Sequence, residues 1–382
     1  MNKKIQLLHI AQSAGYGVTV YVDSLISSLG NTEFDQSLLC SLYYSNKEYG
    51  DNIKNLICIP MNRNIAFSDL KTIIQCRKII KQLMPNIVYC HSAKAGIYGR
   101  LACLGTSIKV VYNPHGWAFN MKCSSLKKLF YIIVESIFAF MTDIIITISD
   151  YERKTTPRTI PFSKLKVIKN GIDVNRCRTI LRSNKLSRKQ FGIPDDAFVV
   201  GIIARISFQK GQDMFVDIAK KVKSVIPNAY FVIVGGKSDD IDIESLINKN
   251  GLDRCFLITG EVQDAIRYAS LFDVAVLTSR WEGFGLVLLE YMVAQKPIVA
   301  FNIDAIPEII KNESNGLLIE PFNLDAFASG IIKLYHDISF AGELANSGYD
   351  IVATSFDIKR VTNEHESLFY NLLNKNAGGK IN

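Results

Sequence analysis

The sequence lacks the marks of a disulfide-bonded, metal-bound or membrane-spanning protein. Its eight cysteines form no Cys-x-x-Cys pair and its five histidines show no metal-ligand spacing, so we expect free thiols and no zinc site. The longest apolar run, residues 129–148, contains Glu135 and Asp143, whereas a spanning helix needs about 20 mostly uncharged residues. The first apolar segment, residues 5–10, is too short for the core of a signal peptide. We therefore expect a cytoplasmic protein with reduced cysteines.

The chain has a surplus of positive charge, and this surplus is unevenly distributed. The formal net charge is +8; residues 1–165 contain 19 Lys and Arg against 10 Asp and Glu, whereas residues 166–382 contain 25 against 26. A basic first half suggests an anionic partner, either nucleic acid or a membrane surface. Lys122, Lys127 and Lys128 precede an apolar helical stretch at 129–140, a pattern compatible with peripheral attachment to anionic lipid. An ordinary solvated basic face explains the same lysines equally well.

Short β-rich runs alternate with helical patterns along the whole chain. Alternation of this kind predicts an α/β fold with parallel sheets and helices on both faces. We expect two Rossmann-like domains, residues 1–165 and 166–355, followed by a helix and tail at 356–382. The predicted strands are 5–10, 37–41, 55–59, 87–90, 110–113 and 144–148 in the first half, and 198–204, 230–234, 256–259, 274–277, 297–300 and 316–319 in the second.

A glycine-rich turn between a strand and a helix is the most informative motif. The turn Glu282-Gly283-Phe284-Gly285 leads into a helical run that starts at Leu286 and contains Glu290. The glycines let the backbone approach a ligand closely, and the amides of Phe284, Gly285 and Leu286 would open the helix and attract a diphosphate. Two carboxylates beside a bound phosphate suit the hydroxyls of a sugar or ribose. On spacing alone, a surface turn with two solvated glutamates is an equal alternative.

Further candidate residues follow other predicted strands. Arg205 follows the strand 198–204, and Lys210 lies five positions later, so a guanidinium and an ammonium can neutralise a diphosphate together. His115, in Asn113-Pro114-His115-Gly116, can hydrogen-bond a sugar hydroxyl, although a lone histidine is more often structural. Gly15 and Gly17 follow the first strand and could cradle a phosphate, but position 20 is Val20, so the dinucleotide fingerprint is incomplete.

These motifs together resemble the signature of the family 4 glycosyltransferases. The resemblance rests on Glu282-x7-Glu290, on Arg205 with Lys210-Gly211, and on Val234-Gly235-Gly236 at the end of a strand. It extends to the segments Asn170-Gly171-Ile172-Asp173, Pro307-Glu308 and Asn315-Gly316-Leu317-Leu318, and it covers most of the chain. The family has the GT-B fold, with two domains facing across a cleft and a terminal helix that crosses back to the first domain.

The resemblance assigns roles to the candidate residues. It implies an enzyme that transfers a sugar from a nucleotide sugar with retention, in which Arg205 and Lys210 hold the diphosphate and Glu282 holds sugar hydroxyls. Glu290 would hold the ribose, Gly15, Gly17 and Gly235 would lie near the donor, and His115 would orient its sugar. The segment 91–96 is similar to the polysaccharide-assembly branch of the family. A lipid-linked glycan is therefore the expected acceptor, and Lys94 and Arg100 are candidates for contacts with its phosphate.

Several departures from the family pattern limit what the resemblance implies. Tyr16 separates glycines that are usually adjacent, and Gln295 and Asp304-Ala305 replace usual glycines near the donor, so the donor cannot be copied from relatives. Ser238-Asp239-Asp240 has the wrong spacing for an Asp-x-Asp metal site, so we expect no metal and no cofactor. The rivals are a nucleotide-sugar epimerase, a phosphorylase, for which no clear pyridoxal lysine is present, or a non-catalytic protein that binds nucleic acid or membrane.

Overall fold

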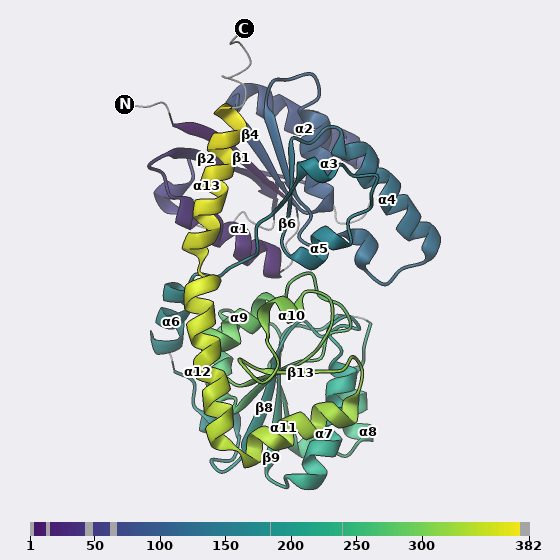
Figure 1. The fold of residues 1–382 in the computed structure, drawn as a ribbon, viewed down its shortest axis with the longest axis vertical. Coiled ribbons are helices and arrows are strands. Elements are labelled where there is room, and N and C mark those ends of the chain that lie inside the picture. Colours follow the sequence, from purple (N-terminus) through teal and green to yellow (C-terminus); the bar gives the residue numbers. More distant parts are fainter. Residues whose placement is uncertain are drawn as a thin grey trace. The chain divides into compact units, whose positions relative to one another are not determined.

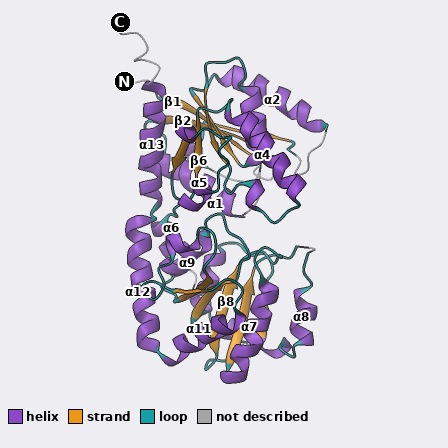
Figure 2. Ribbon diagram, turned by 45° about the vertical axis from the view of Figure 1, so that its right-hand side comes forward, coloured by secondary structure: helices purple, strands orange, loops and turns teal. Residues whose placement is uncertain are grey.

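The chain folds into two α/β units, each built on a parallel sheet (Figure 1). The computed structural model describes residues 4–12, 16–42, 49–61, 67–183, 185–238 and 240–374. Residues 1–171 and 358–382 form unit 1, and residues 172–357 form unit 2. The two stretches of unit 1 lie at opposite ends of the sequence, so this unit is discontinuous along the chain. Figure 2 shows the same elements coloured by type.

Unit 1 contains a sheet of seven parallel strands in the order β3-β2-β1-β4-β5-β6-β7. Their bounds are β1 Ile5–Ala11, β2 Phe34–Ser41, β3 Asn55–Ile59, β4 Ile87–His91, β5 Lys109–Asn113, β6 Ile144–Thr147 and β7 Leu165–Val167. Strand β7 was not predicted from the sequence, because it has only three residues and a lysine at its centre. Because β7 pairs with β6, the predicted boundary at 165/166 is wrong, and unit 1 continues to residue 171.

Helices cover both faces of this sheet. They are α1 Tyr16–Leu29, α2 Ser68–Leu83, α3 Ala93–Ala102, α4 Ser125–Ala139, α5 Asp150–Lys154 and α13 Ile358–Asn374. One core joins the sheet to α1 and α13, and a second core joins its opposite face to α2, α3 and α4. The terminal helix α13 therefore belongs to unit 1, in agreement with the expectation of a returning helix.

Unit 2 contains six parallel strands in the order β10-β9-β8-β11-β12-β13. Their bounds are β8 Phe198–Ile203, β9 Ala229–Val234, β10 Phe256–Ile258, β11 Val274–Leu277, β12 Ile298–Phe301 and β13 Leu317–Ile319. The helices are α6 Val174–Ser183, α7 Gln212–Val225, α8 Ile243–Lys249, α9 Leu286–Val293, α10 Ile306–Ile309, α11 Leu324–His336 and α12 Ile338–Ser355. The buried core of this unit is formed mainly by the strands with α7, α8 and α11.

The strand order reverses direction once in each sheet, and both reversals locate a candidate site. In unit 2 the chain runs outward from β8 to β10 and then returns to β11 on the other side of β8. In unit 1 the same reversal occurs between β1 and β4. Ligands of open parallel sheets bind at the carboxyl ends of the strands beside such a switch point. Arg205 and Glu282 follow β8 and β11, so both lie at the switch point of unit 2.

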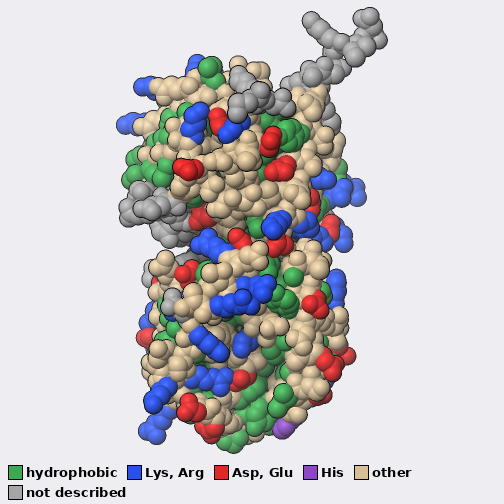
Figure 3. Space-filling view, turned by 90° about the vertical axis from the view of Figure 1, so that its left-hand side faces the viewer, with side chains coloured by type: hydrophobic (Ala, Val, Ile, Leu, Met, Phe, Trp, Pro, Cys, Tyr) green, Lys and Arg blue, Asp and Glu red, His purple; other side chains and the backbone are tan. Residues whose placement is uncertain are grey.

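The structure shows the state of the cysteines, the length and apolarity of the helices, and the distribution of basic side chains. All eight cysteines are thiols, and the sulfur atoms of Cys40 and Cys58 lie 3.7 Å apart, in hydrogen-bond contact but without a disulfide bond. No helix in the described ranges combines the length and the apolarity that a membrane span requires. On the face shown in Figure 3, lysine and arginine side chains gather in unit 2, where α6 carries Arg176, Arg178 and Arg182. A basic surface is therefore not restricted to unit 1.

Candidate active site

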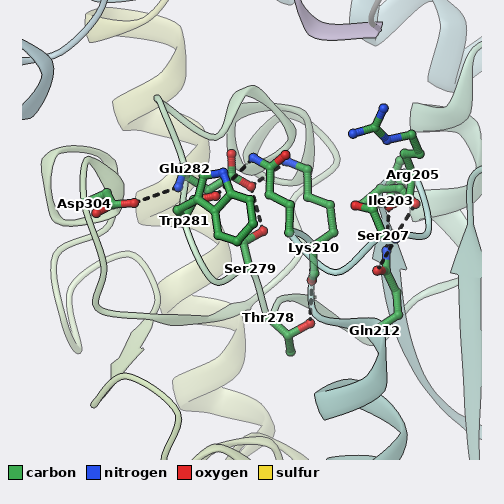
Figure 4. Close-up of polar contacts among 12 residues, drawn as sticks. Ile203, Arg205, Ser207, Lys210, Gln212, Thr278, Ser279, Trp281, Glu282 and Asp304 are labelled. Atoms are coloured by element: carbon green, nitrogen blue, oxygen red, sulfur yellow. Dashed lines mark hydrogen bonds and ion pairs between the residues drawn. The ribbon is translucent and has the colours of Figure 1, made fainter. Parts of the chain in front are cut away.

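Glu282 is held in a fixed position at the switch point of unit 2. It lies in the turn after β11 and is 6% exposed. Its Oε1 accepts hydrogen bonds from the Ser279 hydroxyl at 2.6 Å and from Lys210 Nζ at 2.5 Å, and its backbone amide donates to Asp304 Oδ2 at 2.8 Å (Figure 4). The alternative of a solvated surface glutamate is therefore excluded. A buried carboxylate with a cation beside it can accept ligand hydroxyls in a defined direction.

The two predicted cations differ in how they are paired. Lys210 forms an ion pair with Glu282, whereas the Arg205 guanidinium has no ion-pair or hydrogen-bond partner in the part of the chain that the structure describes. In Figure 4 the Arg205 guanidinium lies apart from the Lys210–Glu282 pair, and no dashed line joins it to the residues drawn. The site therefore has one cation that is already neutralised and one that is available to an anionic ligand.

Gly211 allows Lys210 to lie this close to β11. It precedes α7 with φ of 69°, and a Cβ at this position would lie 2.2 Å from the carbonyl oxygen of Thr278. The Thr278 hydroxyl in turn donates to the carbonyl oxygens of Lys210 and Gly211, at 3.1 and 3.0 Å. Only glycine tolerates both the left-handed backbone and this close contact. The loop after β8 is therefore locked onto the end of β11.

The predicted amide site lies at the start of α9, which begins at Leu286, and Glu290 lies within this helix. Gly285 is its N-cap, with φ of 92°, and the first amides of a helix have no intrahelical acceptor. The Phe284 side chain is buried and packs edge-on against Phe356, so only its backbone amide remains a candidate for ligand contact. Glu290 lies one turn into α9, and burial raises its pKa to about 7.

No sequence motif indicated the residues that support this site. Ser279 and Asp304 both bind Glu282, and Asp304 has φ of 46°. Asp304 replaces a glycine of the family pattern, and its left-handed backbone explains why glycine is usual there. Arg280 makes a two-pronged ion pair with Asp213 on α7 and lies over the Phe208 ring at 3.9 Å. These side chains position the turn through tertiary contacts that residue spacing does not reveal.

Gly235 follows β9 and packs tightly against the chain that follows β8. A Cβ there would lie 2.2 Å from the carbonyl oxygen of Ala204, and its φ is 150°. Its predicted place beside the donor stays a prediction. The described residues contain no group of three His, Cys, Asp or Glu side chains arranged to hold a metal ion. Asp239 lies outside the described residues, and the expectation of a metal-free site also stays a prediction.

His115 lies at the carboxyl end of β5 in unit 1. It has φ of 54°, and its amide donates to Asn113 Oδ1 at 2.9 Å. Its Nε2 lies 3.2 Å from His91 Nδ1, and burial lowers its pKa to about 3, so the ring is neutral at pH 7. Gly17 is exposed near the start of α1, and Gly15 lies outside the described residues. The donor-binding roles of these residues stay predictions.

The two predicted acceptor contacts have different outcomes. The prediction for Arg100 is wrong. Its side chain is 0% exposed, pairs with Glu135 at 3.0 Å and stacks on the Tyr112 ring at 4.0 Å. It joins α3 to α4 and cannot reach a ligand. Lys94 is 12% exposed and lies 3.0 Å from Asp69, a carboxylate that also accepts from the Tyr98 hydroxyl. Its role in acceptor binding stays a prediction.

Comparison with known proteins identifies the family. Residues 15–176 match the family described as glycosyltransferase family 4, and residues 183–350 match glycosyl transferases group 1. A UDP-Gal:alpha-D-GlcNAc-diphosphoundecaprenol alpha-1,3-galactosyltransferase of Escherichia coli is 30% identical over 81% of this chain and 82% of its own length. The chain belongs to the family 4 glycosyltransferases.

Other relatives agree with this assignment. The capsular polysaccharide biosynthesis glycosyltransferase CapM of Staphylococcus aureus is 27% identical to this glycosyltransferase, over 87% of this chain and 88% of its own length. Sucrose-phosphate synthase of Thermosynechococcus elongatus has the same fold, with a TM-score of 0.83 and 19% identity over 97% of this chain and 100% of that chain. HepE of Anabaena, solved with UDP-glucose, has a TM-score of 0.81 and 20% identity over 96% and 100%. The glycosyltransferase therefore has the predicted GT-B fold.

Proposed function

We propose that this glycosyltransferase transfers a sugar from a nucleoside diphosphate donor to a hydroxyl of a lipid-linked glycan, with retention, during bacterial surface polysaccharide assembly. The observation that carries this proposal is the group formed by Glu282, Lys210 and Arg205 at the switch point of unit 2. The names of the Escherichia coli and Staphylococcus aureus relatives support the acceptor class and the process.

The pairing of Lys210 with Glu282 suggests how the donor enters. Arg205, which is available, would bind the diphosphate first through charge-assisted hydrogen bonds. A phosphate oxygen would then compete for Lys210 Nζ, which now lies 2.5 Å from Glu282 Oε1. Loss of that contact would leave Oε1 able to accept a hydroxyl of the donor sugar. In this scheme the donor replaces the Lys210–Glu282 ion pair with a phosphate contact to Lys210 and a hydroxyl contact to Glu282.

The remaining roles follow the same arrangement. Glu290 would accept ribose hydroxyls, and the amides of Phe284, Gly285 and Leu286 would support the phosphate or sugar. His115 would hydrogen-bond a hydroxyl of the donor sugar. We propose that no metal is required, because Arg205, Lys210 and the amides before α9 together offset the charge of the departing diphosphate.

A lipid-linked acceptor requires access to a membrane surface, and we propose that α4 provides it. The side chains of Leu126, Leu129, Phe130, Ile133 and Ile137 are 49–81% exposed, and their spacing puts them on one face of the helix. Lys122, Lys127 and Lys128 lie at its start and are also exposed. The one acidic residue of α4, Glu135, is buried against Arg100. An apolar face with a basic end suits an anionic bilayer.

The decisive experiment measures nucleotide release from UDP-, GDP- and dTDP-sugars with a lipid-diphosphate glycan acceptor, with and without EDTA. We expect release with one donor, unchanged by EDTA, and a drop in kcat/KM of about 10- to 100-fold in Arg205→Ala, as for a lost hydrogen bond to a charged group. Arg178→Ala, which removes a guanidinium from α6, is the control and should be unaffected. Isomerised donor without acceptor would favour an epimerase. Salt-sensitive nucleic-acid binding without donor turnover would favour the non-catalytic alternative.

A further inference from the structure

Four of the five histidines of this chain lie together in the interior of unit 1. His9, His91 and His365 are fully buried, and His115 is partly buried beside them. His9 Nδ1 lies 3.1 Å from His91 Nε2, and His91 Nδ1 lies 3.2 Å from His115 Nε2. At the inner end, His9 Nε2 lies 3.2 Å from Gln36 Oε1. The three imidazoles and the amide thus form one continuous chain of hydrogen bonds.

The strand register explains this arrangement. Gln36 pairs with Leu7 on β1, His91 pairs with Ala11, and His91 also pairs with Asn113 on β5. Each step therefore crosses one strand and advances two residues, which keeps every side chain on the same face of the sheet. The series runs diagonally from the middle of β2 to the carboxyl edge, where His115 is located. The layer it occupies lies between the sheet and helices α1 and α13.

The side-chain amide of Gln36 can face His9 in only one way. Its Nε2 donates to the carbonyl oxygens of Gly30, Ile26 and Asn52, at 2.7, 3.0 and 3.3 Å. Carbonyl oxygens only accept, so the nitrogen must face them and Oε1 must face His9. A hydrogen bond to Oε1 requires a proton on His9 Nε2.

The proton on His9 Nε2 determines which nitrogen is protonated in His91 and in His115. Burial lowers the pKa of His9 to about 4 and that of His115 to about 3, and it also lowers the pKa of His91 well below its usual value. Each ring is therefore neutral near pH 7 and has one N–H. Because His9 Nδ1 is then an acceptor, His91 must donate from Nε2. Because His91 Nδ1 is an acceptor in turn, His115 must also donate from Nε2.

We propose that Gln36, acting through His9 and His91, keeps the proton of His115 on Nε2 and leaves its Nδ1 as an acceptor for a hydroxyl of the donor sugar. The proton placement follows from the hydrogen-bond geometry of neutral rings, whereas the use of Nδ1 rests on the proposed function. Gln36, His9 and His91 are positioning residues in this scheme. Nδ1 has no partner among the described residues.

The groups that surround His9, His91 and His115 do not change this placement of the protons. His365 on α13 lies 2.7 Å from the Val361 carbonyl through Nδ1, so its Nε2 is an acceptor, and the hydroxyls of Tyr21 and Tyr89 lie 3.1 and 3.0 Å from it. These two tyrosines contact His91 only through ring packing. An amide ends the series at Gln36 and cannot carry a proton onward. The arrangement therefore orients His115 and does not conduct protons.

Long-range proton–nitrogen NMR correlation on histidine-labelled full-length protein tests the proton placement directly. We expect the proton on Nε2 in His9, His91 and His115, and on Nδ1 in His365; the exposed ring of His336 is an internal comparison. A proton on Nδ1 of His115, or on both of its nitrogens, at pH 7.5 would overturn the proposal. This measurement needs no substrate, so it is independent of the proposed function.

Two variants interrupt the hydrogen-bonded series from Gln36 through His9 and His91 to His115 at different residues. Gln36→Met removes the terminal acceptor with little change in length, and His9→Phe keeps a ring and leaves the carbonyl partners of Gln36 in place. We expect both to give a mixture of His115 tautomers and about a fivefold lower kcat/KM, the effect of one neutral hydrogen bond. Ser37→Ala, on the same strand but the opposite face, should change neither. If His115 keeps a single tautomer in both folded variants, the proposal fails.

A double-mutant cycle separates positioning from general destabilisation. His115→Asn places an amide oxygen near the location of Nδ1, and that oxygen accepts whatever the state of His91. We therefore expect Gln36→Met to have no further effect on kcat/KM in the His115→Asn background. An equal fivefold loss in both backgrounds would contradict the role of Nδ1. Correct tautomers in a protein that uses no nucleotide sugar would overturn the proposed function and leave the proton placement intact.

Discussion

Among single side chains, Glu290 links the site of unit 2 to pH. Burial raises its pKa to about 7, so the carboxylate loses its charge as the pH falls through neutrality. An ionised carboxylate accepts stronger hydrogen bonds than a protonated one. If ribose hydroxyls bind Glu290, the donor must bind best above pH 7.

This leads to a prediction for the donor KM between pH 8 and pH 6. In the wild type, KM should rise as the pH falls through about 7, because protonation weakens the bonds from the ribose. In Glu290→Gln, donor affinity at pH 8 should be about tenfold lower, and KM should no longer change in this range. The measurement is initial-rate kinetics at saturating acceptor. A pH dependence of the same size in the glutamine variant would assign the titration to another group.

Residue identity alone predicts a site well when the motif is local. Glu282 and Glu290 lie in one turn and the helix after it, and Lys210 lies in a separate local motif after β8; the structure brings Lys210 and Glu282 into direct contact although they are 72 positions apart. Arg100 shows the opposite case: its partner Glu135 lies 35 positions away on another helix, and no local pattern indicates that the arginine is buried. The histidine series was missed for the same reason, because its members come together only through the strand register.

Among the elements, α4 gives a prediction about membrane binding. Vesicles of phosphatidylcholine with phosphatidylglycerol should bind the protein, and vesicles of phosphatidylcholine alone should bind it weakly. Phe130→Ser with Ile133→Ser should lower binding at least tenfold, because each buried apolar side chain contributes about 1.5–3 kcal/mol. Lys127→Gln with Lys128→Gln should lower it by a similar factor and remove most of its salt dependence.

A matched control distinguishes this face from general surface hydrophobicity. Ile338 on α12 is 79% exposed, more than any residue of the α4 face except Leu126, but it belongs to unit 2. Ile338→Ser should leave vesicle binding unchanged. Equal loss in this variant, or concentration-dependent dimerisation abolished by the α4 changes, would contradict the membrane role.

The sequence indicated α4 correctly as a helix because a helical period of apolar residues is a local signal, whereas the three-residue strand β7 carries too short a pattern to detect.

For the whole molecule, the four clustered histidines predict that acid destabilises unit 1 specifically. Folding lowers the pKa of His9 and His365 from about 6.5 to about 4, and that of His115 to about 3. Below pH 6.5 the unfolded chain binds protons that the folded unit does not, so stability is present above 6.5 and falls toward pH 4. Each such proton contributes up to about 1.4 kcal/mol per pH unit.

Buried carboxyl groups act with the opposite sign. The pKa values of Glu152 in unit 1 and of Glu290 in unit 2 are raised from about 4.5 to about 7. These groups therefore contribute fully to folding stability below pH 4.5, and this stability is lost as the pH rises through 7. In unit 1 two glutamates with raised pKa values, Glu152 and Glu366, oppose four histidines. In unit 2 the only histidine is the exposed His336, so no comparable acid loss is expected there.

The two tryptophans allow each unit to be observed separately. Trp117 is buried in unit 1, and Trp281 belongs to unit 2. We expect urea unfolding followed by Trp117 fluorescence, in Trp281→Phe, to shift to lower urea between pH 6.5 and pH 4.5. Unfolding followed by Trp281, in Trp117→Phe, should shift little over the same range. A shift of equal size in both variants would mean that the histidine cluster does not control acid stability.

The return of α13 to unit 1 also has a consequence for the order of biosynthesis. A ribosome releases β1 to β7 first, but the helix that covers them ends at Asn374, 203 residues after Gly171. At about 5–20 residues per second, this delay lasts roughly 10–40 s. During that time the chain carries a seven-stranded sheet that lacks His365 and one of its covering helices, whereas unit 2 is released without interruption. The domain that is translated second can thus finish folding first, and the nascent first domain is the part of the chain that most needs protection from aggregation.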